Sequence, residues 1–248
     1  MEPAFALRFT SSDSNGPMHG MPDVSITGMN SSGPFRSGRS WYPRVLANIS
    51  AIFWDVGGVL LSNAWDRPQR RRALAHFALD EVEFEDRHEM LVSSFERGKI
   101  NLQDYLQRTV FYRPRSFTPE DFRGFMFSLS QPCQETLALA RSLARSCNYL
   151  MATVNNESTE LNLYRIQTYG LGEIFDAFVS SCFVGLRKPE EGIYHLALDI
   201  TQRPPEECCF VDDRPLNVEA ATRLGMRAIR MENTQQLRQE LRTLGVAA

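Results

Sequence analysis

The segment 52–61, IFWDVGGVLL, constrains the fold of this chain more than any other. Apolar residues of strand-forming types lead to Asp55, and the pair Gly57-Gly58 follows almost at once. An apolar run that stops at two glycines predicts a buried strand that ends in a tight loop. Open α/β sheets bind their ligands just outside the carboxyl ends of the strands. Asp55 is therefore a candidate for chemistry.

Further strands are predicted at 148–153, 177–180, 208–212 and 227–231, after a first strand at 50–55, and helical patterns lie between them. Leu237, Leu241 and Leu244 line one face of the last of these helices. Strands that alternate with helices predict a parallel sheet covered on both faces. The expected fold class is α/β, with a Rossmann-like, doubly wound parallel sheet as its core.

The long interval between the first two predicted strands shows helix signals and no convincing strand. Asn101 is placed to cap one helix, and Thr118 followed by Pro119 predicts the start of another. We expect residues 65–132 to form an inserted helical cap that stands over Asp55 and excludes water from it. The catalytic core then comprises residues 47–64 and 133–248.

Composition excludes several classes of protein. Residues 1–46 are rich in Ser, Gly, Pro and Met and poor in aliphatic residues, which predicts a disordered tail. The net charge of −3 gives no general attraction to nucleic acid or to a membrane surface, and no apolar run approaches the ~20 residues that span a bilayer. Five cysteines without C-x-x-C spacing predict reduced thiols in a cytoplasmic protein. The sequence leaves the oligomeric state open, a homodimer included.

Polar residues stand at or just beyond three further predicted strands. Thr153 ends the second strand, Lys188 follows the third and is expected to open a helix together with Pro189, and Asp212 with Asp213 ends the fourth. Because the carboxyl ends of parallel strands meet at one edge of a sheet, we expect these side chains to gather around Asp55. Two adjacent carboxylates favour a cation beside them, since like charges otherwise repel.

The order Asp, Thr, Lys, Asp-Asp and the spellings FWDVGGVL, GLRKPEEGIY and FVDDRPLNVEAA resemble the haloacid dehalogenase-like (HAD) superfamily of hydrolases. The resemblance covers about residues 49–245. The spellings are similar to the branch that holds small sugar-phosphate phosphatases and the phosphatase domain of soluble epoxide hydrolase. The resemblance implies a Mg²⁺-dependent phosphomonoester hydrolase, whose partner is a small phosphorylated metabolite such as a sugar phosphate.

The resemblance also implies roles for the charged residues. Asp55 would attack phosphorus and form an aspartyl phosphate, and Lys188 would balance the charge of Asp55 and of the phosphoryl group. Mg²⁺ prefers hard oxygen ligands, which Asp55, the backbone carbonyl of Gly57 and Asp213 would supply. Asp212 stands where the family often has glycine, so it would act from behind the ligands, and it is the second candidate, after Asp213, for the direct metal ligand.

The second predicted strand would supply the phosphate-binding group. Thr153 would hydrogen-bond a phosphoryl oxygen, helped by the backbone N–H of Val154. The family usually has asparagine directly after the hydroxyl residue, where this chain has Val154, so Asn155 or Asn156 would serve instead. Asn217 would orient the carboxylates of the fourth strand.

Gly57 is a departure from the family pattern, because most phosphatases of the superfamily carry an acid there that protonates the leaving group. General acid–base catalysis contributes about 10²–10⁴-fold. Glu96 and Asp66 of the expected cap are candidates to replace the acid, and the sequence does not choose between them.

Two other functions stay open. The first is a metal-independent 2-haloacid dehalogenase, which the glycine at 57 and the carboxylate at 213 oppose. The second is a catalytically weak binding or regulatory domain, which the charges at 55, 188 and 213 oppose, since a domain without catalysis has no need to keep buried charges together.

Two groups of residues are expected to have no part in catalysis. The basic run Arg70-Arg71-Arg72 predicts a solvated helix face. The histidines in helical context, His76, His88 and His195, lack a partner pattern and are expected to be structural.

Overall fold

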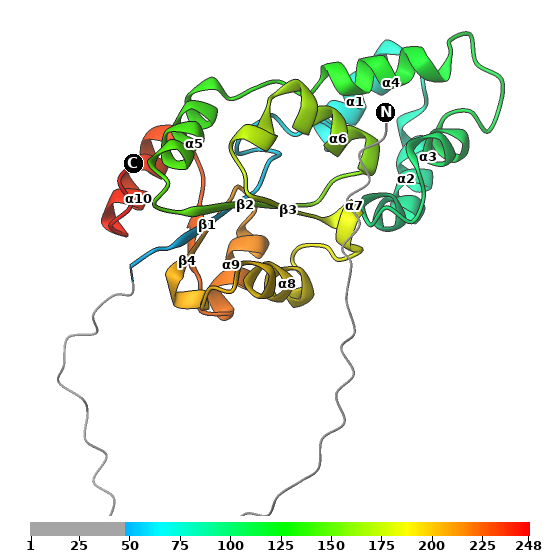
Figure 1. Cartoon of the computed structure of the whole chain (residues 1–248). Helices are drawn as coiled ribbons and strands as arrows, with labels where there is room; N and C mark the ends of the chain where they lie inside the picture. Colours follow the sequence, from blue (N-terminus) through cyan, green and yellow to red (C-terminus); the bar gives the residue numbers. More distant parts are fainter. Residues whose placement is uncertain (1–47) are drawn as a thin grey trace, which may run out of the picture. The chain divides into compact units, whose positions relative to one another are not determined.

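A parallel five-stranded sheet forms the centre of the protein, as the computed structural model describes it for residues 48–248 (Figure 1). The strands are β1 (Ala51–Trp54), β2 (Leu150–Asn155), β3 (Ala177–Ser180), β4 (Cys208–Asp212) and β5 (Arg227–Arg230). They lie in the order β3-β2-β1-β4-β5. The chain changes direction across the sheet between β1 and β4, which is the place where open α/β sheets bind ligands. The predicted tail, residues 1–46, lies outside the described residues.

Helices cover both faces of this sheet, which confirms the predicted doubly wound α/β fold. Figure 1 shows α5 (Gln134–Ser146), α6 (Thr159–Thr168) and α10 (Thr234–Thr243) on one side of the sheet, and α8 (Glu191–Thr201) and α9 (Pro215–Arg223) on the other. Strand β1 is buried throughout because its side chains alternate between these two layers. Ile52 and Trp54 join the core under α5 and α10, while Ala51 and Phe53 join the core under α8 and α9.

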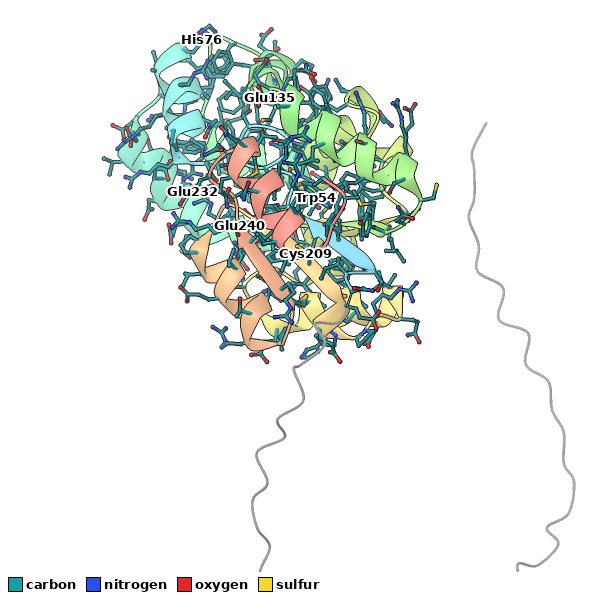
Figure 2. All side chains as sticks on the ribbon, turned by 90° about the vertical axis from the view of Figure 1, so that its left-hand side faces the viewer. Trp54, His76, Glu135, Cys209, Glu232 and Glu240 are labelled. Atoms are coloured by element: carbon teal, nitrogen blue, oxygen red, sulfur yellow. The ribbon has the colours of Figure 1, made fainter. Side chains whose placement is uncertain are left out.

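Figure 2 places Trp54 and Cys209 deep among the side chains of the sheet, where both belong to the same apolar core. His76, by contrast, lies at the outer end of helix α1. The burial of Trp54 directly before Asp55 fixes where the carboxylate emerges from the sheet.

Four helices lie between β1 and α5: α1 (Arg67–His76), α2 (Glu81–Glu96), α3 (Leu102–Thr109) and α4 (Pro119–Ser128). They share an aromatic core in which Trp65 packs edge-on against Phe84 and Phe122. The two predicted helix starts are confirmed, since Asn101 caps α3 and Thr118 forms a capping box at the start of α4. We call these four helices the cap. Its limits at residues 65 and 132 stay a prediction.

Three expectations about local structure were wrong. Strand β2 continues to Asn155, two residues beyond its predicted end. The segment Lys188-Pro189 does not open a helix, because the short helix α7 (Ser181–Val184) follows β3 and α8 begins only at Glu191. Arg70 is not solvated: it is buried and pairs with Glu85 at 2.7 Å.

Two single-turn 3₁₀ helices complete the described elements, at Leu171–Glu173 and at Pro205–Glu207. Among residues 48–248, no helix combines the length and the apolar composition that crossing a bilayer requires.

Candidate active site

A cavity of about 500 Å³ opens at the carboxyl end of β1, and Asp55, Gly57 and Lys188 are among the residues that line it. Asp55 is 7% exposed, and its backbone N–H donates to Val211 of β4 at 2.8 Å. The side-chain Oδ1 accepts from the N–H of Val56 at 2.8 Å and faces Lys188 Nζ at 2.9 Å. Oδ2 accepts no hydrogen bond from residues 48–248, so one oxygen of a fixed carboxylate is free to react.

Lys188 links two strands through their carboxylates. Its Nζ lies 2.9 Å from Asp55 Oδ1 and 2.6 Å from Asp212 Oδ2, and its side chain is 1% exposed. Burial alone would lower the pKa of Lys188, but the two aspartates outweigh burial and the pKa is raised. Burial acts to raise the pKa of Asp55, and Lys188 acts to lower it. The lysine therefore stays charged and holds Asp55 in place.

The adjacent residues Asp212 and Asp213 differ in their surroundings. Asp212 is fully buried, and both of its oxygens are bonded: the amide of Asn217 donates to each at 3.0 Å, and the N–H of Arg214 donates at 2.8 Å. Asp213 has a buried Oδ1 without a hydrogen-bond partner among the described residues. Asn217 thus holds Asp212, while Asp213 is left with an unused oxygen.

Gly58 allows this arrangement because of its backbone. Its φ is +79°, and a Cβ on it would lie 2.3 Å from Asp213 Oδ2. The loop after β1 can approach the carboxylate of β4 only where a side chain is absent. At Gly57, a Cβ would lie 2.8 Å from Asn63 Oδ1, whose Nδ2 is 3.5 Å from Asp213.

The predicted phosphate-binding residues of β2 do not line the cavity. Thr153 pairs with Trp54 in the sheet and is fully buried, and Val154 packs in the core under α8 and α9. The side chain of Asn155 is occupied, because it donates to Asn162 at 3.1 Å and accepts from the hydroxyl of Ser180 at 2.8 Å. The reason is that β2 runs two residues further than predicted, which keeps its middle inside the sheet.

Asn156 stands at the cavity instead. Its amide exchanges two hydrogen bonds with the backbone of Lys188, each 2.9 Å long. The sequence named Asn156 only as an alternative. Asn156 is the first residue after β2, but Asn155 directly before it is polar as well, so the sequence alone did not single Asn156 out.

Three further carboxylates line the cavity from the cap and the neighbouring loops: Asp66, Glu96 and Glu157. Asp66 pairs with Arg214. Glu157 pairs with the buried Arg165 at 3.0 Å. Burial raises the pKa of Glu96 to about 7, against the effect of the nearby Arg187. Of these three carboxylates, Glu96 is thus the one whose pKa is raised to a value close to neutral pH.

His88 of α2 lines the cavity and was not expected to take part in it. Trp65 Nε1 donates to the hydroxyl of Tyr105 at 2.9 Å, and the same hydroxyl is hydrogen-bonded to His88 Nδ1, 2.8 Å away. Burial lowers the pKa of His88 to about 4, which keeps the ring neutral.

The carboxylate cluster fits a divalent metal ion by its chemistry. Single oxygens of Asp55, Asp212 and Asp213 lie within 4.8 Å of one another. Lys188 contacts both Asp55 and Asp212. The Oδ1 of Asp213 has no hydrogen-bond partner among the described residues, so it offers a hard oxygen ligand to a metal ion.

A family model of haloacid dehalogenase-like hydrolases matches residues 49–225 of the chain. Flavin mononucleotide hydrolase 1 of Arabidopsis thaliana is 28% identical over 170 residues, which are 65% of this chain and 65% of that protein. Bifunctional epoxide hydrolase 2 of Mus musculus is 39% identical over 71 residues, which are 29% of this chain and 13% of that protein. The chain thus matches less than two thirds of the length of either relative.

A solved structure has a similar fold. It is an enzyme of the same family from Bacteroides thetaiotaomicron in a magnesium complex, and it superposes with a TM-score of 0.67 at 17% identity. The match covers 77% of this chain and 99% of that one. At this identity the likeness concerns the fold alone.

Proposed function

The chain belongs to the haloacid dehalogenase-like hydrolase family, and we propose that it is a Mg²⁺-dependent phosphomonoester hydrolase in which Asp55 forms an aspartyl phosphate. The observation that carries the proposal is the oxygen pattern of the site. Asp55 offers a free Oδ2 on a fixed side chain, and Asp213 offers a buried Oδ1 without a partner. Phosphoryl transfer needs a positioned nucleophile and cations around the transferred group. Asp55 Oδ2 would be the nucleophile, and Asp213 Oδ1 would be a ligand for the cation.

In the proposed mechanism, the cavity places the phosphorus of the substrate in line with Asp55 Oδ2. Lys188 Nζ holds Oδ1, which orients the attack and offsets the charge of the phosphoryl oxygens. Attack forms the aspartyl phosphate and breaks the ester bond, and water then hydrolyses the aspartyl phosphate. Asp55, Asp213 and the carbonyl of Gly57 would hold the metal, with Asp212 kept behind them by Lys188 and Asn217. Bound Mg²⁺ would neutralise charge on the phosphoryl oxygens.

The substrate is proposed to be a small phosphorylated metabolite. The cavity of about 500 Å³ accepts a molecule of the size of a sugar phosphate or somewhat larger. The relative from Arabidopsis thaliana is named for the hydrolysis of flavin mononucleotide, so this phosphate monoester is tested beside sugar phosphates.

The test is an assay of phosphate release from p-nitrophenyl phosphate, sugar phosphates and flavin mononucleotide, with Mg²⁺ and with EDTA. We expect release that depends on Mg²⁺ and that Asp55→Asn abolishes without unfolding the protein. Asp199→Asn, an exposed carboxylate on α8, is the matched control and should keep the wild-type rate. Equal rates for Asp55→Asn and the wild type would refute the nucleophile. Halide release from 2-haloacids in EDTA, without phosphate release, would favour the dehalogenase instead.

A further inference from the structure

Most of the family carries an acid at the position of Gly57, and the side chains nearest to Gly57 are not acids. A Cβ on Gly57 would meet Asn63 Oδ1 at 2.8 Å and Arg165 Nη1 at 3.5 Å. An amide and a guanidinium are both unable to supply a proton to a leaving group near neutral pH. The proton for the alcohol must therefore come from another side of the cavity.

Each of the three carboxylates that line the cavity beyond the aspartate cluster has an arginine partner, and they differ in their other contacts and in exposure. Glu157 Oε1 accepts from both the N–H and the hydroxyl of Ser158, and its Oε2 lies 3.0 Å from Arg165. Asp66 forms an ion pair with Arg214, in which the side chains are 38% and 52% exposed. Glu157 thus has a partner on each of its oxygens, and Asp66 lies in an exposed ion pair.

Glu96 is the third carboxylate, and its surroundings differ. Its Oε2 lies 2.7 Å from Arg187, and its carboxyl makes no other polar contact within residues 48–248. The side chain is 25% exposed at the cavity. The charged groups that face it are Arg187, Glu157, Asp66 and Arg70, and their effects oppose one another. Burial is the largest influence and raises the pKa to about 7.

The backbone at the end of α2 is fixed to the core, which fixes Glu96 relative to the nucleophile. The hydroxyl of Ser181 donates to the carbonyl of Glu96. Arg97 donates at 2.8 Å to the carbonyl of Gly185, directly after α7. Gly98, with φ of +67°, approaches so closely that a Cβ would lie 2.3 Å from the carbonyl oxygen of Cys182. Arg187, the partner of Glu96, directly precedes Lys188 in the chain.

We propose that Glu96 is the general acid and base of the reaction. This rests on the proposed phosphatase function. When Asp55 Oδ2 bonds to phosphorus and the bond from phosphorus to the leaving oxygen breaks, the carboxyl of Glu96 gives its proton to that oxygen, and an alcohol leaves. The carboxylate of Glu96 then takes a proton from the water that attacks the aspartyl phosphate. Phosphate leaves, Asp55 is restored, and Glu96 again carries its proton, so one water is consumed for each ester.

The experiment compares Glu96→Gln with the wild type on two substrates. Glycerol 2-phosphate has an alkoxide leaving group that needs a proton, whereas p-nitrophenolate leaves without one. We expect kcat/KM of Glu96→Gln to fall about 10²-fold on glycerol 2-phosphate and less than about threefold on p-nitrophenyl phosphate. Asp66→Asn, the other cap carboxylate at the cavity, is the matched control and should leave the ratio of the two substrates unchanged.

Several outcomes would overturn the proposal. An equal loss on both substrates would assign Glu96 a structural role, and a change of the substrate ratio in Asp66→Asn would assign the acid to Asp66. If Glu96→Gln does not fold, the wild-type pH profile decides: the rate on glycerol 2-phosphate should fall above about pH 7, and that on p-nitrophenyl phosphate should not. A wild type inactive on both substrates would refute the phosphatase itself, which separates that failure from a failure of Glu96.

Discussion

Replacing Glu96 by glutamine should make the protein more stable at high pH, and the size of the effect follows from the pKa of Glu96. That pKa rises from an ordinary 4.5 to about 7 in the folded protein. Between these values the folded state holds a proton on Glu96 that the unfolded state does not, so folding takes up a proton. Stability of the wild type must then fall as pH rises through this window.

The magnitude is bounded by the two pKa values. A tenfold change in a proton equilibrium corresponds to about 1.4 kcal/mol, so the shift of Glu96 costs the wild type at most about 3 kcal/mol above pH 7. Glutamine has no proton to take up. The free energy of unfolding of Glu96→Gln, minus that of the wild type, should increase by about 2–3 kcal/mol between pH 4.5 and pH 8.

The assay is urea unfolding at pH 5, 6, 7 and 8, without metal, for the wild type, Glu96→Gln and Glu206→Gln. The last variant removes an exposed carboxylate and should run parallel to the wild type. Only the change of the difference with pH matters, because the effect of the substitution on packing adds a constant, while the ion pair with Arg187 is already contained in the pKa of Glu96. If the curves of Glu96→Gln and the wild type are parallel from pH 5 to pH 8, Glu96 has an ordinary pKa and the reasoning is refuted.

Three substitutions extend these tests. Gly57→Asp should not raise kcat/KM of the wild type on glycerol 2-phosphate, but in the Glu96→Gln background it should raise kcat/KM about tenfold. If steady-state kinetics show no such recovery, the defect of Glu96→Gln is not a missing proton. Gly58→Ala should displace Asp213, weaken Mg²⁺ binding by about tenfold in titration calorimetry and cost about 1–2 kcal/mol through its positive φ; unchanged affinity would remove Asp213 from the metal site. Tyr105→Phe should cost about 1–3 kcal/mol in urea unfolding, since it leaves two buried polar partners unpaired, and a loss below about 0.5 kcal/mol would contradict the hydrogen-bond chain.

Local rules predicted the parts of the fold that depend on neighbouring residues in the chain. The apolar run before Asp55 predicted a strand buried on both faces, and β1 is such a strand. The caps at Asn101 and Thr118 depend on contacts with residues three positions away, so the sequence was sufficient to place them.

Contacts between distant segments determined the rest, and the sequence does not show them. Strand β2 ends where its pairing with β3 ends, at Asn155 opposite Ser180. A threonine two residues earlier fits a strand as well as a binding site, so the residue type at Thr153 could not decide between the two. Arg70 belongs to a basic run in the sequence. Only the structure shows that Arg70 of α1 is buried and forms an ion pair with Glu85 of α2.

The acid of the site illustrates the same limit. The sequence shows that the usual acid is missing, because the position two residues after Asp55, where most of the family carries it, is Gly57. The replacement comes from a helix whose end is tied to Ser181, 85 positions away, and to the residue before Lys188. An acid on the cap also changes what the site can discriminate. A leaving group that does not reach Glu96 receives no proton, so the helices that surround the substrate would select it through catalysis as well as through binding.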